Sequence, residues 1–299
     1  MAPERTELSF LAVAAREARP RQWLKNVLVL AAPAAAGVLD EWSSLWRALV
    51  AFAAMCAAAS GTYFINDIAD VESDRRHPSK RDRPVAAGAL PIRIAATAGV
   101  VLLAGALALA ALTSRRQLVI VVAAYIVVTL LYTAWLKHVA VIDLVAVALG
   151  FVLRAVAGAS AVDVVMSNWF LLCISFGSLF IVAGKRYAEL LQFGEDAVRM
   201  RPSLDGYNAA LLRLVLSLAA AVTVLSYCLW ALDKAGAAHV SWPMYQLSII
   251  PVVTALFRYS LVLETGRGGA PEEVFLSDRA LQALGAIWLV IFGLGLYRG

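Results

Sequence analysis

The segment WRALVAFAAMCAAASGTYFINDIADVESD, residues 46–74, joins a long apolar run to a short acidic one. Eighteen mostly apolar residues, from Trp46 to Tyr63, lead into Asp67, Asp70 and Asp74. An apolar run of this length matches the hydrocarbon core of a bilayer, which is about 30 Å thick. The segment therefore predicts a membrane-spanning helix that carries three carboxylates at one end.

The composition of the whole chain extends this interpretation. Of its 299 residues, 62% are hydrophobic and only 16% are charged. In a soluble protein about one half of the residues are apolar and about one quarter are charged. The apolar residues form nine blocks of about 20 residues, at 24–40, 44–65, 92–112, 118–136, 139–159, 168–184, 209–232, 244–263 and 280–297. We therefore expect an all-α, polytopic membrane protein with nine transmembrane helices, forming a single domain over residues 1–299.

Lysine and arginine are distributed unevenly between the two sides of the predicted membrane. With nine spans, the N-terminus and the loops on its side carry 20 of them, the opposite loops carry 5, and Arg154 lies within a span. Because cytoplasmic loops are enriched in these residues, we expect the N-terminus and the acidic segment to face the cytoplasm of a multi-pass protein in the cell membrane. The net charge of +5 reflects this bias, and no nucleic-acid partner is expected.

The three aspartates are spaced i, i+3 and i+7, so on a continuous helix they would share one face, together with Asn66. Carboxylates this close repel one another unless a cation neutralises them, and hard oxygen ligands suit Mg²⁺. We therefore predict that Asp67, Asp70 and Asp74 are catalytic residues that act as metal ligands. The alternative interpretation is a solvated helix end with ordinary surface acids.

A basic segment follows the aspartates directly. Guanidinium groups bind phosphate oxygens in pairs. Metal-binding aspartates followed directly by lysines and arginines therefore suggest a diphosphate site at the membrane surface. The candidate substrate-binding residues in this segment are Arg75, Lys80, Arg81 and Arg83. Ordinary positive-inside charge would explain any one of them alone.

The pattern NDxxDxxxD after the second span, followed by DRP (82–84) and Gly88, resembles the UbiA-type intramembrane prenyltransferase superfamily over nearly the whole chain. The resemblance implies nine helices around a central cavity open to the cytoplasm. Typical relatives carry a second motif, DxxxD, which binds a second Mg²⁺ at the end of the sixth span. In the corresponding segment, FGSLFIVAGKRYAEL (176–190), Lys185 and Glu189 stand at these positions, and Arg186 adds a second cation. Such a site would hold a metal poorly and a phosphate monoester well.

Three segments are similar to one branch of the superfamily, the decaprenyl-phosphate phosphoribosyltransferases of mycobacterial cell-wall synthesis: RPRQWLKN (19–26), the acidic segment and GSLFIVAGKRYAEL (177–190). The resemblance implies transfer of phosphoribose from 5-phosphoribosyl 1-diphosphate to a polyprenyl phosphate such as decaprenyl phosphate, with Mg²⁺ and inversion at C1. The product would be a precursor of cell-wall arabinan. Two alternatives remain at this point: a prenyltransferase that uses a prenyl diphosphate and an aromatic acceptor, and a transporter of a phosphorylated solute.

Further substrate-binding candidates lie near the predicted cytoplasmic ends of spans: Lys25, Asn66, Tyr132, Lys137 and Asp143. Because intramembrane charges are costly, Asp143 is expected to face the cavity and accept from a ribose hydroxyl, whereas Arg154 is expected to pair structurally. Arg19 and Arg21 would bind phosphate or extend to lipid headgroups, and Arg199 or Arg201 would reach the 5-phosphate. Spans rich in small residues also allow packing within or between subunits, and so a homo-oligomer.

Overall fold

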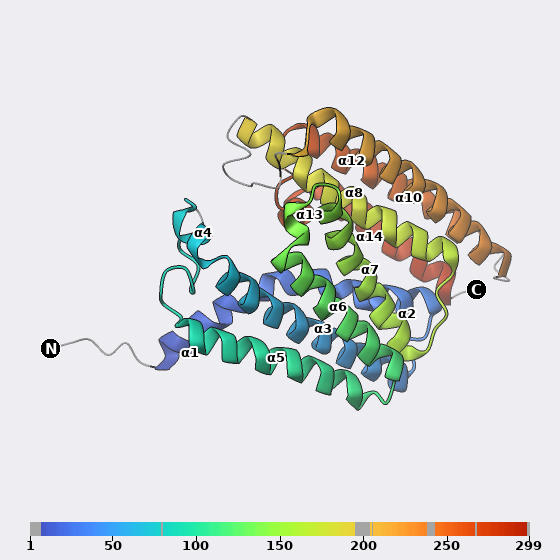
Figure 1. The fold of residues 1–299 in the computed structure, drawn as a ribbon. Helices are drawn as coiled ribbons and strands as arrows, with labels where there is room; N and C mark the ends of the chain where they lie inside the picture. Colours follow the sequence, from blue (N-terminus) through green and yellow to red (C-terminus); the bar gives the residue numbers. More distant parts are fainter. Residues whose placement is uncertain are drawn as a thin grey trace. The chain divides into compact units, whose positions relative to one another are not determined.

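The computed structural model describes residues 7–78, 80–194, 204, 206–237, 243–266 and 268–297, and within these ranges every regular element is a helix (Figure 1). Eight helical segments there are long and apolar enough to cross a membrane. They are α3 (Trp42–Ala69), α5 (Ile92–Leu112), α6 (Arg116–Ala134), α7 (Ile142–Val162), α8 (Asn168–Phe193), α10 (Ala209–Ala237), α11 (Met244–Leu247) with α12 (Ile249–Glu264), and α14 (Arg279–Tyr297). The predicted all-α membrane fold is confirmed.

The chain forms two compact units. The first unit comprises residues 1–136 and 153–164, and the second comprises residues 137–152 and 165–299. Helix α7 contributes its first half to the second unit and its second half to the first. Each unit has its own apolar core and its own cluster of charged side chains, and the two are described separately below.

Helix α3 is the centre of the first unit, where it packs against α5, α6 and the N-terminal segment. Its buried face is built largely from alanine, including Ala48, Ala51, Ala54 and Ala58, each of which is fully buried. Small side chains at this spacing let neighbouring helices approach closely, which is how helices associate without a hydrophobic driving force in lipid. In the second unit, α8 lies beside α10 and contacts α12. There the core combines aliphatic side chains with aromatic ones, which include Phe180, Tyr187 and Tyr259.

The prediction of a continuous transmembrane helix at residues 24–40 is wrong. Its place is taken by a 3-10 helix, η1 (Pro20–Leu30), a short helix, α2 (Ala31–Ala36), and a left-handed residue, Gly37. Arg19, just before this segment, is ion-paired with Asp67 in the last turn of α3, and Glu41, just after it, is the N-cap of α3. The segment therefore runs antiparallel to α3 along its length.

The steeper rise of a 3-10 helix makes this segment long for its residue count. Eleven residues of η1 at about 2 Å each span about 22 Å, and six residues of α2 add about 9 Å. The sum is close to the roughly 30 Å thickness of the hydrocarbon core. Hydropathy alone predicted an apolar segment here, at 24–40 against 20–36 in the structure, but not its conformation.

Two residues one turn apart on α7 hold η1 in place. A Cβ atom on Gly158 would lie 1.7 Å from the Val29 carbonyl oxygen, so only glycine allows the backbone of η1 to approach this closely. Arg154 donates from Nε to Asn26 Oδ1 at 2.6 Å and from Nη2 to the Tyr125 hydroxyl at 2.9 Å. The pairing expected of Arg154 is therefore seen in these bonds.

Candidate active site

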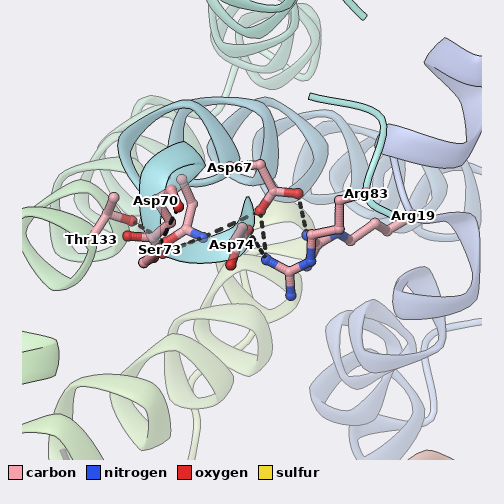
Figure 2. Close-up of polar contacts among 8 residues, drawn as sticks. Arg19, Asp67, Asp70, Ser73, Asp74, Arg83 and Thr133 are labelled. Carbon is pink, nitrogen blue, oxygen red and sulfur yellow. Dashed lines mark hydrogen bonds and ion pairs between the residues drawn. The ribbon is translucent and has the colours of Figure 1, made fainter. Parts of the chain in front are cut away.

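The first unit carries a cluster of aspartates and arginines where α3 ends (Figure 2). Asp67 is only 1% exposed. Arg83 Nη1 donates to Asp67 Oδ1 at 3.2 Å and to Asp74 Oδ2 at 2.7 Å, and Arg19 Nη2 is ion-paired with Asp67 Oδ2. Two guanidinium groups thus neutralise the two buried carboxylates.

The three aspartates do not lie on one continuous helix, so that prediction is wrong. Helix α3 ends at Ala69, Asp70 adopts φ −95° and ψ 5°, and α4 (Val71–Arg76) begins after it. The break leaves Asp67 and Asp74 buried while Asp70 is half-exposed. Asp70 is therefore the member of the motif that is open to solvent.

Asn66 is held between the acidic motif and the end of α6. Its Nδ2 donates to Asp70 Oδ2 at 3.2 Å, and its Oδ1 accepts from the Thr133 hydroxyl at 3.1 Å. Since Thr133 donates to the carbonyl side of the amide, it fixes the orientation in which the amide nitrogen faces the aspartate. Sequence reasoning missed Thr133, because a threonine at the end of an apolar span carries no signal of its own.

The N-terminal segment brings Arg19 to this cluster. Arg19 has a left-handed backbone conformation, with φ 53°, and its guanidinium lies 4.8 Å from the centre of the Tyr63 ring. Ser60 on α3 donates to the Ala18 carbonyl at 2.9 Å and accepts from Trp23 Nε1 at 3.0 Å. These bonds fasten both sides of Arg19 to α3, so Arg19 is part of the cluster and does not extend to the lipid headgroups.

The remaining basic candidates of the first unit differ in their surroundings. Arg75 donates to the Ala86 carbonyl at 3.2 Å and pairs with the exposed Glu72 at 3.0 Å, so it ties α4 to the following loop. Arg81 is exposed, and Lys25, Lys80 and Tyr132 are half-exposed. The loop positions Arg199 and Arg201 lie outside the described residues.

The residues of this cluster fit a divalent cation by their chemistry. Within the described ranges no three His, Cys, Asp or Glu side chains are gathered as metal ligands, and Arg19 and Arg83 contact oxygens of Asp67 and Asp74. The available donors are nevertheless carboxylate and amide oxygens, the kind that Mg²⁺ prefers. A further buried carboxylate, Glu17, has both oxygens without a hydrogen-bond partner in the described part of the chain. Sequence reasoning did not single out Glu17.

The second unit carries its own charged cluster. Asp143, which is 0% exposed, accepts from Arg186 Nε at 3.2 Å and from the Tyr207 hydroxyl. Arg186 also donates to Glu189 Oε2 at 3.3 Å. Lys185 Nζ lies 4.0 Å from Glu189 Oε1. Sequence reasoning missed Tyr207, whose pKa is raised above its ordinary value by burial and by the hydrogen bond to Asp143, so it stays a proton donor.

These contacts bear on two predicted substrate contacts, which stay predictions. Asp143 is buried and accepts from Arg186 and Tyr207, so a ribose hydroxyl would compete with these two partners. Arg186, with a side chain 3% exposed, points to Asp143 and Glu189 and not to solvent, whereas the side chain of Lys185 is 36% exposed. The half-exposed Lys137 precedes α7 in the same unit. Of the two adjacent cations, Lys185 is therefore the one whose side chain is more open to solvent.

Comparison with known proteins identifies the family. The model of the UbiA prenyltransferase family matches residues 27–294. This chain belongs to the UbiA prenyltransferase family. It is 44% identical to the decaprenyl-phosphate phosphoribosyltransferase of Corynebacterium glutamicum, over 93% of this chain and 85% of that protein. It is 45% identical to the protein of the same name from Mycobacterium tuberculosis, over 92% of this chain and 91% of that protein.

A solved UbiA homolog from Archaeoglobus fulgidus, bound to DMAPP and Mg²⁺, has the same fold. Its TM-score is 0.71 at 18% sequence identity, and the match covers 95% of this chain and 98% of that one. At this identity the likeness establishes the fold alone. The multi-pass helical architecture of this UbiA family member thus agrees with a solved structure.

The second unit of this UbiA protein also contains a cavity of about 720 Å³. Its wall includes Glu189 of the charged cluster and residues of α12 and of α13 (Pro271–Ser277). Arg258 closes one side by donating to Asp278 Oδ2 from Nε at 3.1 Å and from Nη2 at 2.8 Å. The segment 271–279, to which the sequence assigned no chemistry, therefore forms part of a polar cavity wall.

Proposed function

We propose that this protein transfers the 5-phosphoribosyl group from 5-phosphoribosyl 1-diphosphate to a polyprenyl phosphate such as decaprenyl phosphate, and releases diphosphate. The observation that carries the proposal is the 44–45% identity, over 92–93% of the chain, with two proteins named decaprenyl-phosphate phosphoribosyltransferase. The lipid then supplies the nucleophile, and the sugar carries the leaving group. The product is a precursor for cell-wall arabinan.

The acidic cluster of the first unit is assigned to the leaving diphosphate. Asn66, Asp67, Asp70 and Asp74 are the side chains that would hold Mg²⁺, which when bound neutralises the charge that develops on the diphosphate. Arg19 and Arg83 already lie against Asp67, and guanidinium groups bind phosphate oxygens in pairs. Their proposed role is to bind the diphosphate oxygens that a metal leaves uncovered, with Arg75, Lys80 and Arg81 adding positive charge beside them.

The phosphate of the acceptor lipid is assigned to Lys185. Support comes from its partial exposure and from the burial of its neighbour Arg186. Arg186 is then a positioning residue, because its bonds to Asp143 and Glu189 hold the end of α8 in place. Lys25, Tyr132 and Lys137 remain candidates for further substrate contacts.

The chemistry requires no general base. The bond between C1 of ribose and the diphosphate oxygen breaks, and the electron pair leaves with the diphosphate. An oxygen of the polyprenyl phosphate, already an anion at neutral pH, forms the new bond from the opposite face and inverts C1. Such a displacement passes through an oxocarbenium-like transition state, so catalysis depends on positioning and on charge stabilisation.

The proposed location is the plasma membrane, with the acidic cluster at the cytoplasmic face, where a water-soluble sugar diphosphate is available. The excess of lysine and arginine on that side of the sequence supports this orientation. A homo-oligomer is compatible with the helix surfaces that the described residues leave exposed.

A transfer assay with purified protein in detergent tests the proposal. Labelled 5-phosphoribosyl 1-diphosphate with decaprenyl phosphate and Mg²⁺ should give a labelled lipid, and omission of either substrate should abolish it. A parallel assay supplies the substrates of the rival reaction, a prenyl diphosphate and an aromatic acceptor. A prenylated acceptor and no labelled lipid would make the protein an ordinary prenyltransferase.

A further inference from the structure

Glu17 is the last residue of α1 (Glu7–Glu17) and is 1% exposed. Both of its carboxylate oxygens are buried, and neither has a hydrogen-bond partner in the described part of the chain. Buried carboxylates are normally paired or hydrogen-bonded, because removing them from water costs several kcal/mol. An orphan carboxylate in a well-packed place therefore points to a ligand that the protein alone does not supply.

The position of Glu17 is fixed by its neighbours. Val13 and Ala18, on either side of it, pack against a buried apolar cluster that includes Phe64 and Val85. The Ala18 carbonyl accepts from Ser60 on α3, and Arg19 is ion-paired with Asp67. The backbone on both sides of Glu17 is thus fastened to the elements that carry the aspartate motif.

The charges around Glu17 do not balance. Asp67 and Asp74 are paired with Arg19 and Arg83, and among the described residues Glu17 is a third buried carboxylate near these two guanidinium groups. With all three carboxylates ionised, the cluster would carry one negative charge more than the two guanidinium groups balance.

We propose that Glu17 is a carboxylate ligand of the divalent cation that the aspartate motif holds, adjacent to Asp67. The inference rests on the metal site of the proposed function and extends it to the N-terminal helix, which the NDxxDxxxD pattern does not include. A divalent cation at this point would supply the missing charge, and hard carboxylate oxygens are the ligands it prefers. Arg19 and Arg83 would then be released from Asp67 to bind diphosphate.

The experiment measures Mn²⁺ binding by electron paramagnetic resonance, without substrate, in the purified full-length protein. The variants are Glu17→Gln, which keeps the size of the side chain and removes the charge, and Glu17→Asp, which keeps the charge. Glu72→Gln is the control, because Glu72 is an exposed acid in α4, within the acidic segment, and its side chain pairs with Arg75. Thermal unfolding of each variant, with and without Mg²⁺, provides a second measurement.

Glu17→Gln should weaken Mn²⁺ binding at least about tenfold, since even residues that only orient ligands contribute 10–100-fold. It should unfold at the same or a higher temperature without metal, because an unpaired buried charge is removed, and it should gain less from Mg²⁺ than the wild type. Glu17→Asp should lie between the two, and Glu72→Gln should match the wild type.

Unchanged Mn²⁺ affinity in Glu17→Gln would overturn the inference and assign Glu17 a neutral, protonated role that glutamine reproduces. A variant that unfolds early but binds Mn²⁺ normally would also overturn it, in favour of a structural role. A wild type that transfers phosphoribose and yet binds no Mn²⁺ would remove the metal role of Glu17 while leaving the proposed reaction intact. Mn²⁺ binding without any transfer would instead leave the metal site in place and overturn the proposed reaction.

Discussion

Arg186 donates from Nε to Asp143 Oδ2 at 3.2 Å, and the side chains of both residues are almost completely buried. Forty-three positions separate them in the sequence. The pair joins the end of α8 to the start of α7 within the second unit. Its burial makes it a structural interaction, although both residues have the character of substrate ligands when the sequence is considered alone.

Replacing Arg186 with glutamine should therefore reduce stability. The change leaves Asp143 buried without its charged partner, which typically costs about 3–5 kcal/mol. Unfolding in detergent should show the loss, and the double variant with Asp143→Asn should recover a large part of it, because the two residues interact directly. Additive losses in the double-mutant cycle would contradict a direct pair.

Lys185 should behave differently from its neighbour. Its side chain is 36% exposed, and a charge-assisted hydrogen bond to phosphate contributes about 1.5–3 kcal/mol, so Lys185→Ala should lose roughly 10–100-fold in kcat/KM. Its unfolding temperature should remain near that of the wild type. Lys185→Asp should lose more, since it places a carboxylate beside Glu189 and the phosphate. Normal kinetics for Lys185→Ala would show that Lys185 does not bind the phosphate and that its charge only follows the positive-inside rule.

Asp70→Asn is the clean test of the metal site. Asp70 is half-exposed and bonded to Asn66, so the variant should stay folded. Transfer should fall at least about 100-fold, which exceeds the 10–100-fold loss typical of residues that only orient ligands. EDTA should have the same effect on the wild type, and added Mg²⁺ should reverse it. Full activity of Asp70→Asn in EDTA would exclude the metal assignment.

Asp67→Asn should affect both activity and stability. Asp67 is buried between Arg19 and Arg83, so its charge compensates two guanidinium groups as well as serving as a candidate ligand. We expect loss of transfer and a lower unfolding temperature. An Asp67→Asn protein as stable as Asp70→Asn would show that the two arginines find other partners without it.

Gly158→Ala tests the close approach of η1 to α7. The new methyl would meet the Val29 carbonyl oxygen at 1.7 Å, and overpacking typically costs about 1–3 kcal/mol. Gly105→Ala in α5 is the matched control, because nothing lies within 4 Å of its Cβ position. The control should be neutral or up to about 1 kcal/mol more stable, owing to the helix propensity of alanine. Equal stability of the two variants would contradict the packing of η1.

Single cysteines at Lys80 and Lys234 test the orientation, in a background in which the free Cys56, Cys173 and Cys228 are replaced by serine. Lys80 follows α4, and Lys234 lies in the last turn of α10. An impermeant maleimide should label the Lys234 position in intact cells and the Lys80 position only after permeabilisation. The reverse pattern would place the acidic cluster on the outer face.

The acidic motif shows where prediction from sequence ends. The residue types and their position at the end of a span indicated a charged site, and this part of the prediction agrees with the cluster of Asp67 and Asp74. The single helical face was wrong, because the chain turns at Asp70 and buries the two outer aspartates. Arg83 was predicted to bind substrate, but its two aspartate contacts depend on a loop that folds back toward α3.

By itself, the sequence determined the extent of the apolar segments, the uneven distribution of positive charge and the presence of two charged motifs. These properties are local: the thickness of the bilayer sets the length of a span whatever its neighbours are. Only the tertiary structure decided that η1 is a 3-10 helix against Gly158 and that Arg19 and Arg83 neutralise Asp67. It also decided that the Glu17 oxygens are buried with no hydrogen-bond partner among the described residues. Such pairings join residues far apart in the chain, and their energies depend on distance and burial, which a linear pattern does not contain.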